Sequence, residues 1–145
     1  MKKHKGFSQE LLEKYDLPAR KKIKEKLGEF VIDNPDPYKQ DLIITKEDYK
    51  YKYIELQVCT AWVGKKIPYK NVYVFERKGC YGEDTLFITL NKFLTKTYIF
   101  DAVSFKNKQP RRIKKYSREY IYDVPWNRIM PVDIDCLDAE TLMQY

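Results

Sequence analysis

The chain has 145 residues, with 28 Lys and Arg against 21 Asp and Glu, and a formal net charge of +7. This length suits one domain with a single packed core, and 43% apolar and 15% aromatic residues exclude a disordered basic tail. No apolar run approaches the roughly 18 residues of a membrane span, and the N-terminus lacks the apolar stretch of a signal peptide. We therefore expect a soluble intracellular protein, cytoplasmic or nuclear, with no membrane partner.

Cysteine and histidine usage excludes several kinds of site. Cys59, Cys80 and Cys136 are widely spaced and form no CxxC pair, which argues against a disulfide framework and a zinc ribbon. His4 is the single histidine, so Ser-His-Asp triads, Cys-His nucleophiles and histidine-based zinc sites are excluded. Any catalysis must use carboxylates, lysines, tyrosines or a hard metal ion.

The first part of the chain predicts helices. Residues 8–15 suit a short helix, and Pro18 suits the first turn of a second helix over 18–28. Gly28 is expected to end this helix, because glycine readily adopts the backbone conformation of a C-cap. The apolar residues of the second helix recur at four-residue steps and form one stripe opposite a basic face: Ala19, Ile23 and Leu27.

From residue 30 onward the chain is rich in β-branched and aromatic residues between turn residues. The proline-rich segment 33–37 predicts a loop, 46–48 a hairpin turn and 138–143 a closing helical turn. The predicted strands are 30–32, 41–44, 52–58, 71–77, 85–90, 97–100 and 119–124. We expect an α+β fold with N-terminal helices packed on a central mixed, largely antiparallel sheet.

These elements predict one domain over 1–145. Its parts are a helical N-terminus (7–28), a β-rich core (30–103), a basic segment (104–120), and a C-terminal strand with an acidic tail (121–145).

The basic segment predicts a partner. Its lysines and arginines alternate with Tyr116 and Tyr120, and cations beside aromatic rings suit phosphates and exposed bases. A solvated, lysine-rich edge is the alternative interpretation. The candidate nucleic-acid-binding residues of this segment are Lys106, Lys108, Arg111, Arg112, Lys114, Lys115 and Arg118, and Lys65 and Lys66 join them from an earlier loop.

Two acidic residues fall in neighbouring predicted strands. In the strand 52–58, the period of two places Glu55 and Gln57 on one face and the apolar residues on the other, which faces the core. If this strand pairs with 41–44, the Asp41 carboxylate comes close to Glu55 near one end of the hairpin. Two carboxylates at a sheet edge suit a hard cation.

Over roughly residues 18–60 the chain resembles the PD-(D/E)xK nuclease superfamily. The resemblance rests on a helix ending at Gly28, a short strand, a Pro/Asp turn, Asp41 before an apolar run, and a strand carrying Glu55-Leu56-Gln57. The superfamily core is a helix, a β-hairpin carrying an Asp and then Glu-x-Lys, a further helix and another strand. The resemblance implies a restriction-endonuclease-like fold.

The resemblance also implies a mechanism. Asp41 and Glu55 would hold Mg²⁺, with Mn²⁺ as a substitute and the Leu56 carbonyl as a further ligand, for hydrolysis of a phosphodiester bond. Gln57 stands where the superfamily usually has lysine, and its amide orients water but supplies no charge. Lys65, Lys66 or Lys78 are candidates to replace that cation.

The superfamily often carries an acid on its first helix. Glu25 is the candidate, with Glu29 as the alternative, and a solvated acid paired with a neighbouring lysine is the competing interpretation. Asp33 and Asp36 are candidates for a further carboxylate at the metal, although Asx turns explain them equally well. Tyr38 is a weaker candidate for acid–base or nucleophilic chemistry.

Trp62 and Trp126 could stack on bases, but packing in the core or at its rim is the more common role of such residues.

Three functions remain open. The first is a divalent-metal-dependent nuclease, an endonuclease or exonuclease acting on DNA or RNA with DNA favoured; a homodimer is one arrangement that cutting both strands allows. The second is a non-catalytic nucleic-acid-binding or structural module, including an inactive relative of the same fold. The third is an interaction subunit unrelated to nucleic acid, in which the charge only aids solubility.

Overall fold

The computed structural model describes residues 10, 12–106, 108–112 and 120–145. Within this part of the chain the α-helices are α2 (Leu17–Leu27) and α3 (Ala139–Leu142). The strands are β1 (Val31–Asp33), β2 (Leu42–Ile44), β3 (Tyr53–Cys59), β4 (Val72–Phe75), β5 (Thr85–Asn91), β6 (Lys96–Asp101), β7 (Arg111–Arg112), β8 (Tyr120–Val124) and β9 (Met130–Asp133). No helix in the described part is both long and apolar enough to cross a membrane.

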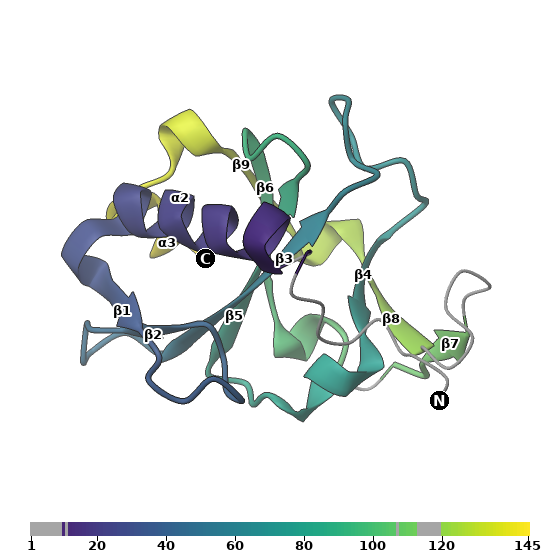
Figure 1. Cartoon of the computed structure of the whole chain (residues 1–145). Helices are drawn as coiled ribbons and strands as arrows, with labels where there is room; N and C mark the ends of the chain where they lie inside the picture. The colour runs from purple at the N-terminus through teal and green to yellow at the C-terminus, as the bar shows by residue number, and fades with distance from the viewer. Residues whose placement is uncertain (1–9, 11, 107, 113–119) are drawn as a thin grey trace.

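The strands form two sheets. The larger has the order β1-β2-β3-β5-β6-β9, in which only the β3–β5 pair is parallel, and the smaller has the order β4-β8-β7 (Figure 1). The prediction of an α+β fold with a mixed, largely antiparallel central sheet is confirmed. Because β3 and β5 run parallel, the chain between them must cross over, and this crossover contains β4 and a 3-10 helix, Glu76–Cys80.

The N-terminal helices differ from the prediction. In the described N-terminal residues one α-helix, α2, packs on the sheet, and a π-helical turn, Leu12–Asp16, leads directly into it. The expected separate helix over 8–15 lies in part outside the described residues. Pro18 occupies the first turn of α2, as predicted. Proline cannot donate the usual helical hydrogen bond, and a π-turn is a common place for a change of helical register.

The predicted apolar stripe of α2 is buried: Ala19, Ile23 and Leu27. The helix ends at Gly28, whose φ of 56° and ψ of −133° are readily adopted only by glycine. This stop turns the chain through a short 3-10 helix into β1, so that β1 and β2 follow α2 along one edge of the sheet.

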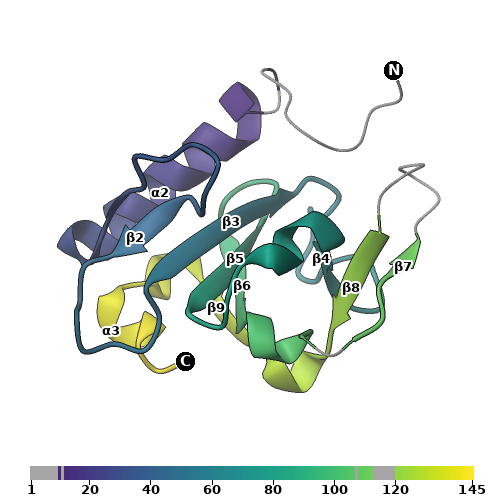
Figure 2. The ribbon, with the colours of Figure 1, turned by 90° about the horizontal axis from the view of Figure 1, so that it is seen from below.

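Two apolar cores lie on opposite faces of the central sheet. Figure 2 shows α2 and α3 on one side of this sheet and the smaller sheet on the other. Ile54, Leu86 and Ile88 belong to the core beneath α2 and α3, whereas Phe87 and Phe100 belong to the core shared with the smaller sheet. Successive side chains of a strand point to opposite faces, so a strand covered on both sides is buried throughout. Every residue of β5 is accordingly buried.

Two strands were not predicted. β9 contains Pro131, which lacks a backbone donor, and it pairs only with β6 at the sheet edge, where proline is tolerated. β7 is two residues long. The predicted strand over 71–77 is shorter than expected, because its last two residues belong to the 3-10 helix Glu76–Cys80.

Candidate functional site

The structure brings Asp41 and Glu55 together. Leu42 pairs with Ile54 in the antiparallel β2–β3 ladder, so Asp41, one residue before Leu42, lies opposite Glu55. Asp41 Oδ2 accepts a hydrogen bond of 2.8 Å from the backbone N–H of Leu56. This bond fixes the Asp41 carboxylate beside β3, although Asp41 itself precedes β2.

Each carboxylate has a cationic partner. Arg20 of α2 lies 2.9 Å from Asp41 Oδ1, and Lys78 of the 3-10 helix lies 3.0 Å from Glu55 Oε2. The Lys78 and Glu55 side chains are only 16% and 9% exposed. Lys78 Nζ also donates to the backbone carbonyl of Leu56 at 3.3 Å. A positive charge therefore lies between the Glu55 carboxylate and the Leu56 carbonyl.

The environment of Glu55 favours its neutral form. Burial, opposed by the attraction of Lys78 and reinforced by the negative charge of Asp41, raises the pKa of Glu55 from 4.5 to about 7. Glu55 Oε1 is buried and has no hydrogen-bond partner among the described residues. Such an oxygen is costly in a folded protein unless water or a bound group contacts it.

Gln57 lies on the same face of β3 as Glu55. Its Nε2 donates to the Tyr73 carbonyl at 2.8 Å and to Thr89 Oγ1 at 2.7 Å. Its Oε1 is buried without a partner among the described residues. The two donors are thus used to join β3 to β4 and β5, which leaves the amide oxygen available to accept a hydrogen bond from water.

The crossover delivers Lys78 to this face. β4 leaves the central sheet to pair with β8, and the 3-10 helix Glu76–Cys80 then brings the chain back toward β3. A Cβ atom on Gly79 would lie 3.0 Å from the ring of Tyr122 in β8, so glycine allows this turn to pack closely against the smaller sheet. In sequence, Lys78 belongs to a second Glu-x-Lys, Glu76-Arg77-Lys78, yet it joins the first motif in space.

Arg20 was not predicted as part of the site, whereas Glu25 was. Glu25 is exposed and lies five residues after Arg20, which is about 140° around the helix. The residue of α2 that reaches Asp41 is therefore Arg20. The sequence feature that could have indicated Arg20 is its position directly after Ala19, the first residue of the buried stripe. It lies on a helix that we expected to pack beside the hairpin.

The other candidate residues near the hairpin have structural roles. Asp33 pairs with Lys24 at 2.8 Å. Asp36 Oδ1 accepts from the Tyr38 backbone N–H at 2.9 Å, and Asn34 Oδ1 accepts from that of Asp36 at 3.1 Å. Both hydrogen bonds belong to Asx turns, the interpretation that competes with a metal-binding role for these residues. Tyr38 is 89% exposed, which leaves its hydroxyl in ordinary aqueous surroundings.

Part of the predicted basic segment is neutralised. Lys106 forms an ion pair with Glu83, and Arg111 binds Asp123 through two hydrogen bonds of 2.6 and 3.1 Å. Lys108 is exposed, as is Arg112 at the edge of the smaller sheet. The remaining candidates, Lys114, Lys115 and Arg118, lie outside the described residues. Lys65 and Lys66 are exposed in the loop between β3 and β4.

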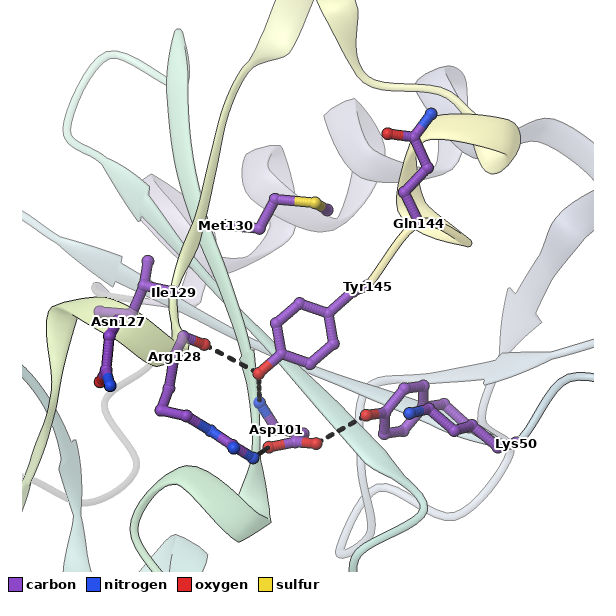
Figure 3. Close-up of a pocket in the computed structure, with 9 residues that line it drawn as sticks. Lys50, Asp101, Asn127, Arg128, Ile129, Met130, Gln144 and Tyr145 are labelled. Carbon is purple, nitrogen blue, oxygen red and sulfur yellow. Dashed lines mark hydrogen bonds and ion pairs between the residues drawn. The ribbon is translucent and has the colours of Figure 1, made fainter.

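A pocket of about 370 Å³ lies where the C-terminal segment meets β6 (Figure 3). The buried Asp101 carboxylate in its wall accepts from Tyr51 Oη at 2.6 Å and from the Ser104 backbone N–H at 3.3 Å, and Arg128 lies 3.8 Å away. Tyr145 Oη donates to the Arg128 carbonyl and accepts from the Asp101 backbone N–H. Both oxygens of the Asp101 carboxylate thus already accept hydrogen bonds from the protein itself. We interpret this cluster as the anchor of the C-terminal segment.

The Asp41–Glu55 pair offers oxygen atoms of the kind that hard cations take as ligands. In the described part of the chain no three His, Cys, Asp or Glu side chains cluster, so the donor set is two carboxylates and the Leu56 carbonyl. Oxygen donors of this kind suit Mg²⁺, which keeps several waters when few protein ligands are present. The unpartnered Glu55 oxygen also fits such a group. Comparison with protein-family models, curated proteins and solved structures finds no significant match to this chain.

Proposed function

We propose that this protein is a divalent-metal-dependent nuclease of the PD-(D/E)xK type, with Asp41 and Glu55 as metal ligands. The observation that carries the proposal is the position of the Lys78 ammonium between Glu55 and the Leu56 carbonyl, with Asp41 alongside. A positive charge already binds to the two atoms that a metal would use. These oxygens therefore stabilise a positive charge, and a divalent ion would take the place of Lys78 rather than join it.

The order of elements supports the proposal. α2, the β2–β3 hairpin with Asp41 and Glu55, and the further strand β5 follow in the order of the superfamily core. One departure is that β4 and a 3-10 helix stand between β3 and β5 in place of a further helix. A restriction-endonuclease-like fold thus belongs to the proposal, and β4 with its 3-10 helix would be this chain's own variation.

The residues of the site would share the chemistry. When bound, Mg²⁺ would supply Lewis acidity and an activated water for attack on a phosphodiester bond. Gln57 Oε1 is available to orient that water by accepting a hydrogen bond. Arg20 holds Asp41 in place from α2. The Leu56 N–H does the same from β3, so two donors restrain the Asp41 carboxylate.

Lys78 would have two positions. In the present arrangement its ammonium compensates the buried Glu55 carboxylate. Lys78, which lies on the short 3-10 helix Glu76–Cys80, would move away from Glu55 if these oxygens held a divalent ion. Displaced a short way, the ammonium would supply the positive charge that Gln57 lacks and stabilise charge on the scissile phosphate.

The test is metal-dependent cleavage of labelled DNA and RNA by the purified protein with Mg²⁺ or Mn²⁺. We expect Asp41→Asn and Glu55→Gln each to lower the cleavage rate at least 100-fold without loss of binding. Glu47→Gln is the matched control, since it removes an exposed carboxylate elsewhere and should leave the rate unchanged. Cleavage that survives both site variants would refute the proposal.

A non-catalytic nucleic-acid-binding module is the second candidate. The observation that favours it is the Lys78–Glu55 ion pair, which satisfies one carboxylate oxygen without a metal. In that case Lys78 would be a permanent substitute for the ion. Salt-dependent binding of nucleic acid with no cleavage by wild type or Lys78→Ala in either metal would support this candidate over the nuclease.

A further inference from the structure

Two loops lie side by side at one end of the central sheet. β3 and β5 are parallel, so the loops that follow them, 60–71 and 92–95, leave from the same end. The backbone N–H of Lys92 donates to the carbonyl of Trp62 at 3.0 Å, which joins the two loops directly. Figure 1 shows both extending beyond the sheet near the labels β3 and β6.

The two loops carry only positive charge. Neither 60–71 nor 92–95 contains an Asp or Glu, and together they contain four lysines, all exposed: Lys65, Lys66, Lys70 and Lys92. In the described part of the chain no acidic side chain forms an ion pair with them. These charges are therefore available to an anionic partner, unlike those of Lys106 and Arg111 in the basic segment, which are already paired.

Exposed aromatic rings accompany these lysines. Phe93 is 60% exposed, Trp126 42% and Tyr69 39%, although burial of such rings is normally favourable. We call this set of lysines and rings the basic aromatic platform: Lys65, Lys66, Tyr69, Lys70, Lys92, Phe93 and Trp126.

An aromatic framework holds the platform in place. Trp62 is 1% exposed and stacks on Tyr98 with ring centroids 4.3 Å apart, and Tyr98 meets Trp126 edge-on at 5.2 Å. Trp126 Nε1 donates to the Lys70 carbonyl at 2.8 Å. Both ends of the loop 60–71 are thus fixed to the sheet, so little ordering entropy would be lost when a ligand binds.

We propose that the basic aromatic platform binds single-stranded nucleic acid. Lysines attract the phosphates, while Phe93, Tyr69 and Trp126 offer faces on which unpaired bases stack. A duplex keeps its bases stacked within the helix and could use only the lysines. This inference rests on the proposed nuclease function. It adds that single-stranded nucleic acid is the class of substrate.

The position of the platform favours nucleic acid over a membrane surface, which basic and aromatic side chains also suit. Glu55 lies four residues before the end of β3 at Cys59, or about 13 Å along the strand. A strand of nucleic acid that binds the platform can therefore extend toward the carboxylate site. A membrane lying on the platform would bring nothing to that site.

The test is fluorescence anisotropy with a labelled 15-nucleotide poly(dT) strand and a mixed-sequence duplex of equal length, in EDTA so that cleavage plays no part. We expect the single strand to bind at least fivefold more tightly. Lys65→Ala/Lys66→Ala should reduce the slope of log affinity against log salt by about 1.4. Phe93→Ala should weaken binding of the single strand about fivefold or more and leave duplex binding unchanged.

The control removes the same charge elsewhere. Lys21→Ala/Lys50→Ala replaces two exposed lysines outside the platform and should change affinity less than twofold. The urea midpoint of each variant shows that it is folded, which Phe93→Ala should be because the ring is largely exposed. Equal loss in control and platform variants, or no effect of Phe93→Ala, would overturn the proposal.

Two further outcomes separate this proposal from the others. Anionic phosphatidylserine vesicles that bind through Phe93 and Lys65, when poly(dT) does not, would identify a membrane surface and overturn it. Platform-dependent binding of poly(dT) without metal-dependent cleavage would sustain the platform and refute the nuclease. Metal-dependent cleavage by a protein whose poly(dT) binding does not depend on the platform residues would support the nuclease and overturn the platform.

Discussion

Replacing Lys78 by methionine should make folding stability depend on pH in a new range. In the native protein the raised pKa of Glu55 means that the contribution of this group to stability is fully present below pH 4.5 and is lost as pH rises through about 7, where Glu55 ionises. Lys78 is the group that opposes this rise, because its positive charge stabilises the Glu55 carboxylate. Methionine keeps the apolar stem and removes the charge.

The size of this pH-dependent loss of stability follows from the pKa shift of Glu55. A rise from 4.5 to about 7 corresponds to roughly 3 kcal/mol of lost stability across that pH range. Without Lys78 the Glu55 pKa should lie above 7, so the loss continues at about 1.4 kcal/mol per pH unit beyond pH 7. Removal of one partner of a buried pair costs about 3–5 kcal/mol when the other stays charged. We therefore expect a cost below about 1 kcal/mol at pH 5 and about 2–4 kcal/mol at pH 8.

Urea unfolding at pH 5, 7 and 8 measures these costs, with Lys78→Met/Glu55→Gln as the matched control. The double variant should lose this part of the pH dependence, since the Glu55 carboxyl has been removed. Mg²⁺ should also stabilise Lys78→Met more than wild type, because it no longer competes with the ammonium. A cost of Lys78→Met that is the same at pH 5 and pH 8 would refute the reasoning.

Three other outcomes are expected. Tyr51→Phe removes the 2.6 Å hydrogen bond to buried Asp101 and should lower the free energy of unfolding by about 1.5–3 kcal/mol in urea titrations; no change would contradict the anchoring role of this pair. Gly28→Ala meets no atom within 4 Å but forces alanine to a φ of 56°, so thermal unfolding should show a loss of about 1–3 kcal/mol, and an unchanged midpoint would argue against this C-cap. Burial raises the pKa of Tyr49 and Tyr145 to about 12, so stability should be retained below pH 10 and fall as pH rises through 12. Tyrosinate absorbance and circular dichroism should change together in that range, less steeply in Tyr145→Phe, whereas ordinary titration of both groups would contradict the burial.

Local patterns predicted much of the fold. The stripe of Ala19, Ile23 and Leu27, with Gly28 as the stop, was sufficient to define α2. Alternation along β3 separated Glu55 from the apolar face, and the hairpin brought Asp41 opposite it. These features depend on residues close in sequence, for which helix and strand periods carry the information.

Long-range features were not predictable in the same way. Lys78 reaches Glu55 only because the crossover leaves the sheet, pairs with β8 and returns, and the pattern around Glu76 resembles an ordinary strand end. The residue of α2 that faces Asp41 was not predictable for a related reason, since the rotation of the helix is set by its packing. Arg20, rather than Glu25, faces Asp41.

We propose above that Asp41, Glu55 and the Leu56 carbonyl form a divalent-cation site at which Lys78 now stands. The most direct measurement is the anomalous difference density of crystals soaked in Mn²⁺, for wild type and Glu55→Gln. We expect a peak between the two carboxylates and the Leu56 carbonyl in wild type only, with Lys78 moved away from Glu55. No peak at this position, with Lys78 still bound to Glu55, would contradict it.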